Sequence, residues 1–239
     1  MRPLLLAVQF LTRLPVRVEF CPARMALAPG WFPLVGMAIG GAAAAVHAGA
    51  LWLWPAPIAV VMSLAATLWL TGALHEDGLA DTADGLGGAA PRARALEIMR
   101  DSRIGTYGAV ALGVVLCLKI MALVALPWVA VALVAAHGLS RASSVLVLAT
   151  SRYARDAGAA AGMAAPGLRL PSATALACLA MLAWAFGLGV LGAIAGLGLA
   201  HIVLRRACER RLGGYTGDTL GAMQQVSELG VYLGLLACL

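Results

Sequence analysis

A cluster of carboxylates interrupts a chain that is otherwise very apolar. Glu76, Asp77, Asp81 and Asp84 lie within the stretch LHEDGLADTADGLGG, residues 74–88. If this stretch is helical, the three aspartates follow one another at i, i+4 and i+7, so their side chains share one face. The three carboxylates on such a face repel one another unless a cation neutralises them. Mg²⁺ and Mn²⁺ bind carboxylate oxygens together with substrate phosphates. The spacing therefore predicts a metal site held by Asp77, Asp81 and Asp84, with Mg²⁺ as the cofactor.

The plainer interpretation of the same residues is an exposed acidic loop whose carboxylates pair with Arg92 and Arg94. Two features favour metal binding instead. The stretch adjoins the end of a long apolar run, and its glycines allow another backbone or a ligand to approach closely.

A second polar stretch, EIMRDSRIGTYG at residues 97–108, adds arginines soon after these carboxylates. Arginine binds phosphate oxygens through two parallel hydrogen bonds, so this stretch predicts phosphate binding next to the metal. The same arginines also suit the cytoplasmic side of a membrane, and the two roles are compatible. The candidate substrate-binding residues here are Arg100, Asp101, Ser102, Arg103 and Thr106.

A third stretch, GGYTGDTLGA at residues 213–222, is rich in glycine and threonine. A loop of this kind exposes backbone N–H groups to an anion, although it lacks the lysine and the spacing of a P-loop. Thr216, Asp218 and Thr219 are therefore candidate substrate-binding residues. The alternative for Asp218 is an ordinary helix N-cap.

Two cations fall inside apolar runs. Ionisable groups at such depth usually face a partner or a cavity, so we expect Arg141 to face the bundle interior and to bind an acidic group or a phosphate. Lys119 either does the same or extends its amine to the membrane surface. His47, His137 and His201 are isolated in the sequence and are interpreted as packing or interfacial residues.

The composition of the chain differs from that of a soluble protein. Of 239 residues 62% are hydrophobic and 12% are charged, with a mean hydropathy of +0.91. A soluble domain is apolar in only about half of its residues. The fold class predicted is therefore all-α, a polytopic transmembrane bundle forming one domain over residues 1–239. The five scattered cysteines indicate neither a disulfide framework nor a zinc site.

The distribution of basic residues predicts how many times the chain crosses the membrane. The basic residues gather near the N-terminus, at 92–103, at 152–169 and at 205–211, and the positive-inside rule assigns all four groups to the cytoplasm. This requires the long apolar run 172–204 to cross twice, turning near Gly187, Gly189 and Gly192. The expected spans lie within residues 32–54, 56–74, 107–126, 128–149, 172–204 (two crossings) and 220–239.

Seven crossings place the N-terminus in the cytoplasm and the C-terminus outside the cytoplasmic (inner) membrane. Residues 1–31 are expected to form a retained interfacial segment, because arginines interrupt what would otherwise resemble a signal peptide. Residues 75–106 are expected to form a cytoplasmic catalytic loop. The net charge of +6 follows from topology and gives no reason to expect nucleic-acid binding.

Five motifs together resemble one family. HEDGLADTADGLGG, EIMRDSRIGTYG, GGYTGDTLGA and, more weakly, FLTRLPV and SRYARDAG are similar to the cobalamin (5′-phosphate) synthase family, the adenosylcobinamide-GDP ribazoletransferases. The resemblance runs from about residue 10 to residue 228. It implies a Mg²⁺-dependent inner-membrane enzyme that joins adenosylcobinamide-GDP to α-ribazole or its 5′-phosphate and releases GMP.

In such a reaction the transferred phosphoryl group and the departing GMP need positive charge, and the attacking hydroxyl needs a base. Asp77, Asp81 and Asp84 would hold the metal, and His75 or Glu76 would be the base. Arg100 and Arg103 would contact the diphosphate.

Two other classes are weighed against this one. A CDP-alcohol phosphotransferase shares Asp-Gly and Ala-Asp elements, but its pattern has an arginine after the alanine where this chain has Asp81. A cation transporter would carry acidic residues inside its spans, whereas Asp77, Asp81 and Asp84 lie at a boundary. The expected partners are the two substrates and the lipid bilayer, and both a homo-oligomer and contact with other corrinoid enzymes stay open.

Overall fold

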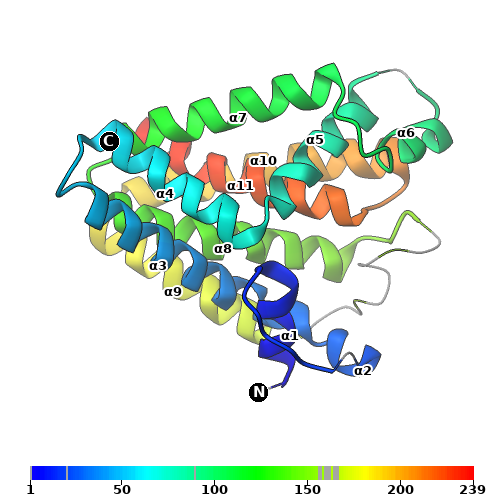
Figure 1. Ribbon diagram of the computed structural model, residues 1–239, viewed down its shortest axis with the longest axis horizontal. Coiled ribbons are helices and arrows are strands. Elements are labelled where there is room, and N and C mark those ends of the chain that lie inside the picture. The colour runs from blue at the N-terminus through cyan, green and yellow to red at the C-terminus, as the bar shows by residue number, and fades with distance from the viewer. Residues whose placement is uncertain (1, 20, 89, 156–157, 159–162, 164–166) are drawn as a thin grey trace.

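The computed structural model describes residues 2–19, 21–88, 90–155, 158, 163 and 167–239. The described chain is a bundle of helices (Figure 1), so the predicted all-α class is confirmed. At the N-terminus α1 (Arg2–Leu11) precedes the short α2 (Pro22–Met25) and the 3-10 helix η1 (Ala28–Trp31). The remaining helices are α3 (Phe32–Ala50), α4 (Ala56–Thr71), α5 (Leu74–Gly87), α6 (Arg92–Ile98), α7 (Thr106–Ala125), α8 (Val129–Thr150), α9 (Arg169–Phe186), α10 (Gly189–Leu212) and α11 (Gly217–Ala237).

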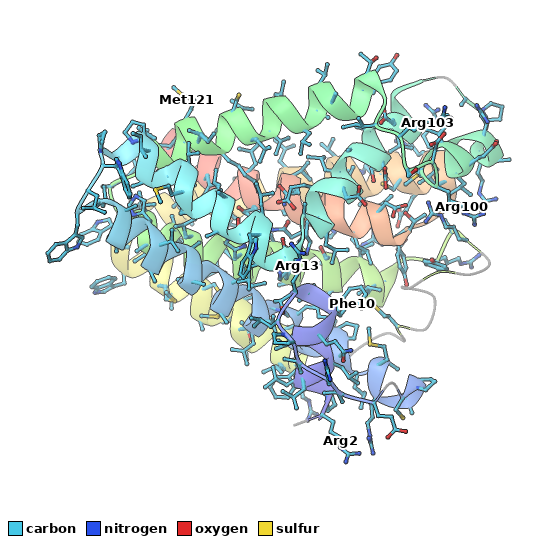
Figure 2. The ribbon with its side chains drawn as sticks, in the orientation of Figure 1. Arg2, Phe10, Arg13, Arg100, Arg103 and Met121 are labelled. Carbon is cyan, nitrogen blue, oxygen red and sulfur yellow. The ribbon has the colours of Figure 1, made fainter. Side chains whose placement is uncertain are left out.

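Several helices have the length and composition of membrane spans. Among the described residues five pass this test, namely Pro22–Ala50, α7, α8, α9 and α10, and a sixth is added if the bent pair α4 and α5 counts as one span. Large apolar side chains such as Met121 on α7 point outward (Figure 2), and 68% of the Met121 surface is exposed. The chain is therefore a multi-pass membrane protein, and the count of seven crossings stays a prediction.

The apolar run 172–204 is broken as expected. Helix α9 ends at Phe186, Gly187 takes the left-handed φ of 55°, and α10 begins at Gly189. Glycine adopts this conformation without the steric cost that a Cβ would add. The run therefore forms two helices rather than one.

Glycines also let α10 and α11 pack closely. Gly192 lies against Gly234 and Gly196 lies against Gly230, and a Cβ on Gly230 would come within 2.5 Å of the Gly196 carbonyl oxygen. Pairs of small residues four apart are the usual means of close helix contact in membranes. Helix α11 also contacts α5, α7 and α8, so it occupies the centre of the bundle (Figure 1).

A sharp bend separates α4 from α5. Gly72 and Ala73 both have positive φ, 65° and 57°, and the two helix axes differ by 88°. The backbone N–H of Arg13 donates to the carbonyl of Leu70 at 2.8 Å, so the N-terminal segment packs beside the bend. Residues 75–106, expected as a loop, thus consist largely of α5 and α6, with α5 crossing the end of α4.

Three of the four basic groups meet at one end of the bundle. Arg92 donates to the carbonyls of Leu212 and Ala154, both at 2.7 Å, and Arg211 donates to the carbonyl of Gly88 at 2.7 Å. The C-terminus lies at the opposite end (Figure 1). This is the arrangement that the charge pattern requires, while the orientation in the membrane stays a prediction.

Candidate active site

The acidic helix α5 is pressed against the start of α11. A Cβ on Gly78 would lie 2.6 Å from the backbone oxygen of Asp218, and one on Gly221 would lie 3.2 Å from the Cα of His75. Only glycines allow this approach. The contact brings the carboxylates of α5 next to Asp218.

Gly78→Ala should therefore disrupt the site. The added methyl group has no space between the two backbones, and overpacking of this kind costs about 1–3 kcal/mol. We expect a lower melting temperature in detergent and lower activity. Gly113→Ala is the matched control, because Gly113 is also helical and has nothing within 4 Å of its position. Equal melting temperatures for the two variants would mean that the α5–α11 contact is loose.

Among the carboxylates of α5, Asp81 has the environment least favourable to its negative charge. Its side chain is half-buried, and this burial, followed by the nearby charges of Asp77 and Asp218, raises the pKa of Asp81 to about 7. Burial also raises the pKa of Asp218, although Arg155 opposes the change with an ion pair at 2.7 Å. The group is short of positive charge, which a bound cation would supply.

Asp84 has a different environment. Its two oxygens accept hydrogen bonds from the backbone N–H groups of Gly105 and Gly108, at 2.7 and 2.8 Å. These groups begin α7, where a carboxylate is favoured by the helix dipole. Within the described residues no three acidic, histidine or cysteine side chains converge closely enough to hold a metal ion. The predicted triad thus shares one helix but is not assembled around a point.

The arginine stretch lies beside the acidic helix without entering its pocket. Arg103 pairs with Asp101 at 2.6 Å, and this contact lowers the pKa of Asp101 to about 2. Arg100 is exposed, as is Arg103 (Figure 2), and Ser102 is exposed too. Thr106 begins α7 and lines an open apolar groove. None of these residues lines the cavity beside Asp77.

The glycine and threonine stretch starts α11. Thr216 is the N-cap, since its side chain accepts from the Thr219 N–H at 3.2 Å while the Thr219 hydroxyl accepts from the Thr216 N–H at 2.8 Å. The alternative that made Asp218 the N-cap is wrong. Asp218 instead turns toward Arg155 and α5.

A pocket of about 180 Å³ opens between α1, α3, α5, α8 and α11. Four of the predicted residues meet in its lining: His75, Asp77, Arg141 and Asp218. The lining also includes apolar residues, among them Phe10 and Phe32, whose rings stack with centroids 5.7 Å apart. The pocket therefore combines acidic, basic and aromatic surfaces.

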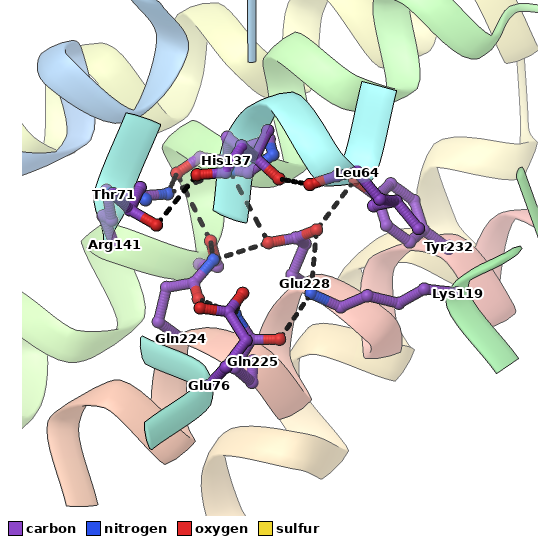
Figure 3. A network of polar contacts seen from close by, with 12 residues as sticks. Leu64, Thr71, Glu76, Lys119, His137, Arg141, Gln224, Gln225, Glu228 and Tyr232 are labelled. Carbon is purple, nitrogen blue, oxygen red and sulfur yellow. Dashed lines mark hydrogen bonds and ion pairs between the residues drawn. The ribbon is translucent and has the colours of Figure 1, made fainter. Parts of the chain in front are cut away.

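Beneath this pocket lies a buried polar network (Figure 3). Glu228 accepts from Lys119 at 3.0 Å, from the Tyr232 hydroxyl at 3.1 Å and from Gln224 at 2.5 Å. Lys119 also donates to Gln225 at 2.7 Å and is 2% exposed. Lys119 thus pairs inside the bundle and does not reach the membrane surface.

Arg141 and His137 extend the same network. Arg141 donates to the His137 carbonyl at 3.0 Å, and the His137 ring lies 3.6 Å from Glu228. His137, interpreted from the sequence as a packing or interfacial residue, is buried, and its ring also belongs to this polar cluster. His201 likewise lies 2.8 Å from the Ser143 hydroxyl, whereas His47 is buried without a partner for its Nε2 among the described residues.

The family model described as cobalamin-5-phosphate synthase matches residues 3–236. The chain belongs to the cobalamin-5-phosphate synthase family. It is 47% identical to an adenosylcobinamide-GDP ribazoletransferase of Leptothrix cholodnii, covering 97% of this chain and 94% of the relative. Proteins of the same name from Shewanella amazonensis (43% identical, 97% and 94% covered) and Ralstonia nicotianae (45%, 99% and 95%) are similar. No solved structure matches the chain.

The match to the cobalamin-5-phosphate synthase family confirms the resemblance drawn from the acidic block. It extends over α5, the pocket and the buried network alike. Sequence reasoning missed that network in this family member, although a signal was present. Gln224, Gln225 and Glu228 are polar residues within an otherwise apolar run, which is a mark of a buried partner or of function.

Proposed function

We propose that this chain is a membrane transferase of cobalamin biosynthesis that joins adenosylcobinamide-GDP to α-ribazole or its 5′-phosphate, with release of GMP. Membership of the family and the names of its relatives support the reaction. The observation that carries the proposal is the meeting of Asp77, Asp218, His75 and Arg141 in one pocket.

The reaction requires the pocket to provide a proton acceptor and positive charge. An acceptor hydroxyl attacks the phosphorus bound to the cobinamide, a new P–O bond forms, and the bond to the GMP phosphoryl oxygen breaks. The hydroxyl proton passes to a base, and negative charge moves to GMP. Fixed cations that meet this charge speed the step because they need no rearrangement.

The carboxylates suit Mg²⁺. Asp77 and Asp81 would hold the ion, with Asp218 close to them, and Asp84, which keeps lone pairs free beyond its two backbone contacts, would bind water in the shell of the ion. Mg²⁺ typically uses one or two protein carboxylates and completes its shell with water and substrate phosphates. When bound it would neutralise charge on the phosphoryl oxygens.

His75 is the better-placed of the two candidate bases. It lines the pocket with Asp77, whereas Glu76 turns toward α11 and accepts from Gln225 at 2.8 Å. We therefore assign the base to His75 and a supporting role to Glu76.

His75→Asn should lower kcat by about 10²-fold or more with a small change in KM, because loss of a base acts on the transition state. Glu76→Gln should be milder, since it keeps the shape and the hydrogen bond. Steady-state kinetics of both variants test this assignment. The reverse order of effects would make Glu76 the base.

Arg100 and Arg103 would bind the diphosphate of the donor from the neighbouring loop, together with Ser102 and Thr106. Arg103 must then leave Asp101, its present partner. Thr216, at the buried start of α11, would position Asp218 through the helix cap.

Arg103→Ala should lower kcat by about tenfold or more, with a smaller effect on KM, since the contact strengthens as charge moves onto GMP. Arg103→Lys should be intermediate because it keeps the charge but loses the planar fork. Arg94→Ala is the matched control, an exposed arginine that pairs with Glu97 at 2.8 Å. Equal kinetics for the Arg94 and Arg103 variants would remove Arg103 from the site.

We also propose the cytoplasmic (inner) membrane as the location, with the N-terminus in the cytoplasm and the C-terminus outside. The gathering of basic groups at one end of the bundle, with the candidate site among them, supports this orientation. Both substrates would then reach the site from the cytoplasm.

A comparison of donors tests the proposed reaction. Membranes containing the protein would be supplied with Mg²⁺, α-ribazole 5′-phosphate and either adenosylcobinamide-GDP or CDP-diacylglycerol. We expect turnover of the corrinoid and none of the lipid. Turnover of the CDP-lipid alone would overturn the assignment in favour of a CDP-alcohol phosphotransferase.

A further inference from the structure

Arg141 is a buried cation that forms no ion pair with any of the described residues. Its side chain is 2% exposed and donates through Nη1 to the carbonyl and ring of its neighbour His137, at 3.0 and 3.1 Å. Its Nε has no hydrogen-bond partner, and within the described residues no carboxylate lies at ion-pair distance from it. A guanidinium keeps its charge even when buried, so an unpaired one is costly unless a ligand completes it.

The position of Arg141 directs it toward the 180 Å³ pocket. Arg141 and His75 line both this pocket and the smaller cavity inside the polar network. A Cβ on Gly36 would come within 2.6 Å of the Arg141 Cδ, so the side chain passes α3 at a point where only glycine leaves space. Arg141, whose Nε donor is unused, therefore borders the space where a ligand would lie.

Part of the pocket lining is apolar. The stacked rings of Phe10 and Phe32 contribute to it, together with Leu148. Aromatic and aliphatic walls of this kind suit a planar aromatic ring system. A purine such as guanine, with polar atoms around its edge, would find few partners along them.

The volume of the pocket limits which ligands it can bind. Pockets for drug-sized molecules have about 300–1,000 Å³. At about 180 Å³ this pocket is too small for a corrin ring and suits a single bicyclic base. Of the two proposed substrates, only the ribazole carries a base of this size whose edge is apolar, since that base is a benzimidazole bearing two methyl groups.

We infer that this pocket binds the acceptor, with the benzimidazole packed against the apolar surface formed by Phe10, Phe32 and Leu148 and the 5′-phosphate on Arg141. The inference rests on the proposed function and deepens it, because it makes Arg141 the residue that recognises the 5′-phosphate of the acceptor. The ribose between these two groups lies toward Asp77 and Asp218, where the phosphoryl transfer is proposed to occur.

Kinetics with two acceptors test the assignment. The KM values for α-ribazole 5′-phosphate, α-ribazole and adenosylcobinamide-GDP would be measured for the wild type, Arg141→Met and Phe10→Ala. Arg141→Met should reduce the preference for the phosphorylated acceptor about tenfold or more, since it removes a charge-assisted contact. Phe10→Ala should raise KM for both acceptors to a similar extent, because both carry the base.

Arg205→Met is the control, because it also removes an arginine but Arg205 is more exposed and does not line the 180 Å³ pocket. It should keep the acceptor preference of the wild type. If Arg141→Met does not fold, calorimetric titration of the wild type with each acceptor gives the binding preference directly, and Arg141→Lys, which keeps the charge but loses the planar fork, should weaken that preference less. An unchanged preference in Arg141→Met, equal wild-type affinity for the two acceptors, or a raised KM for the corrinoid alone would overturn the inference. Absence of wild-type turnover with either acceptor would instead refute the proposed function.

Discussion

Asp81→Asn abolishes turnover while the protein still folds and inserts: this is the largest effect that we expect on activity. The substitution keeps the shape of the side chain but removes a charge from the group that includes Asp77 and Asp218. Loss of one preorganised electrostatic contact typically costs about 10²–10³-fold in kcat. Turnover over a range of Mg²⁺ concentrations measures the effect.

The same substitution should not destabilise the fold. The pKa of Asp81 is raised to about 7, so the folded state binds a proton more tightly than the unfolded state. Stability therefore falls as pH rises from about 4, the ordinary Asp value, to about 7, and Asn removes this loss. The melting temperature of Asp81→Asn should equal or exceed that of the wild type at pH 8.

Glu97→Gln is the control for this experiment, because Glu97 is an exposed carboxylate paired with Arg94. It should behave as the wild type in both measurements. Near-normal kcat in Asp81→Asn at saturating Mg²⁺ would mean that the acidic face of α5 has a structural role only.

Lys119→Met gives the largest expected effect on stability. Lys119 and Glu228 are 2% and 1% exposed, and they meet at 3.0 Å. Removing one partner leaves the other as an uncompensated buried charge, which costs about 3–5 kcal/mol. The thermal melting temperature in detergent and the yield of folded protein should both fall.

The double variant Lys119→Met with Glu228→Gln tests whether the unpaired buried charge causes the loss of stability. It removes both charges, so it should recover most of the lost stability. Arg205→Met provides a surface comparison, because the Arg205–Glu209 pair is more exposed and such pairs contribute about 1 kcal/mol or less. If the double variant is less stable than Lys119→Met alone, the network is held by hydrogen bonds rather than by charge balance.

The parts of the fold that depend on local pattern could be predicted from the sequence. The spacing of Asp77, Asp81 and Asp84 is compatible with one face of a helix, and α5 is such a helix, although residues 75–106 were expected to form a loop. The distribution of basic residues predicted the break in the run 172–204, which lies at Gly187. Both signals are contained in short stretches or in overall charge, so neither requires knowledge of which helices touch.

The parts that depend on contacts between distant residues could not be predicted. Glu228 meets Lys119, 109 positions earlier, and Gln225 meets Glu76 across 149 positions, so no local spacing reveals either pair. The bend before α5 could not be predicted either. It places Ala73 at a φ of 57°, a conformation that residues other than glycine rarely adopt. That bend turns His75 and Glu76 inward.

The central claim is that the junction of α5 and α11 carries out the transfer. Its most direct test uses purified protein with adenosylcobinamide-GDP, α-ribazole 5′-phosphate and Mg²⁺, and measures GMP and the joined corrinoid, the latter by mass. We predict equal amounts of the two products from the wild type and neither from Asp81→Asn. Equal product formation by wild type and Asp81→Asn, or GMP release without a joined corrinoid, would contradict the claim.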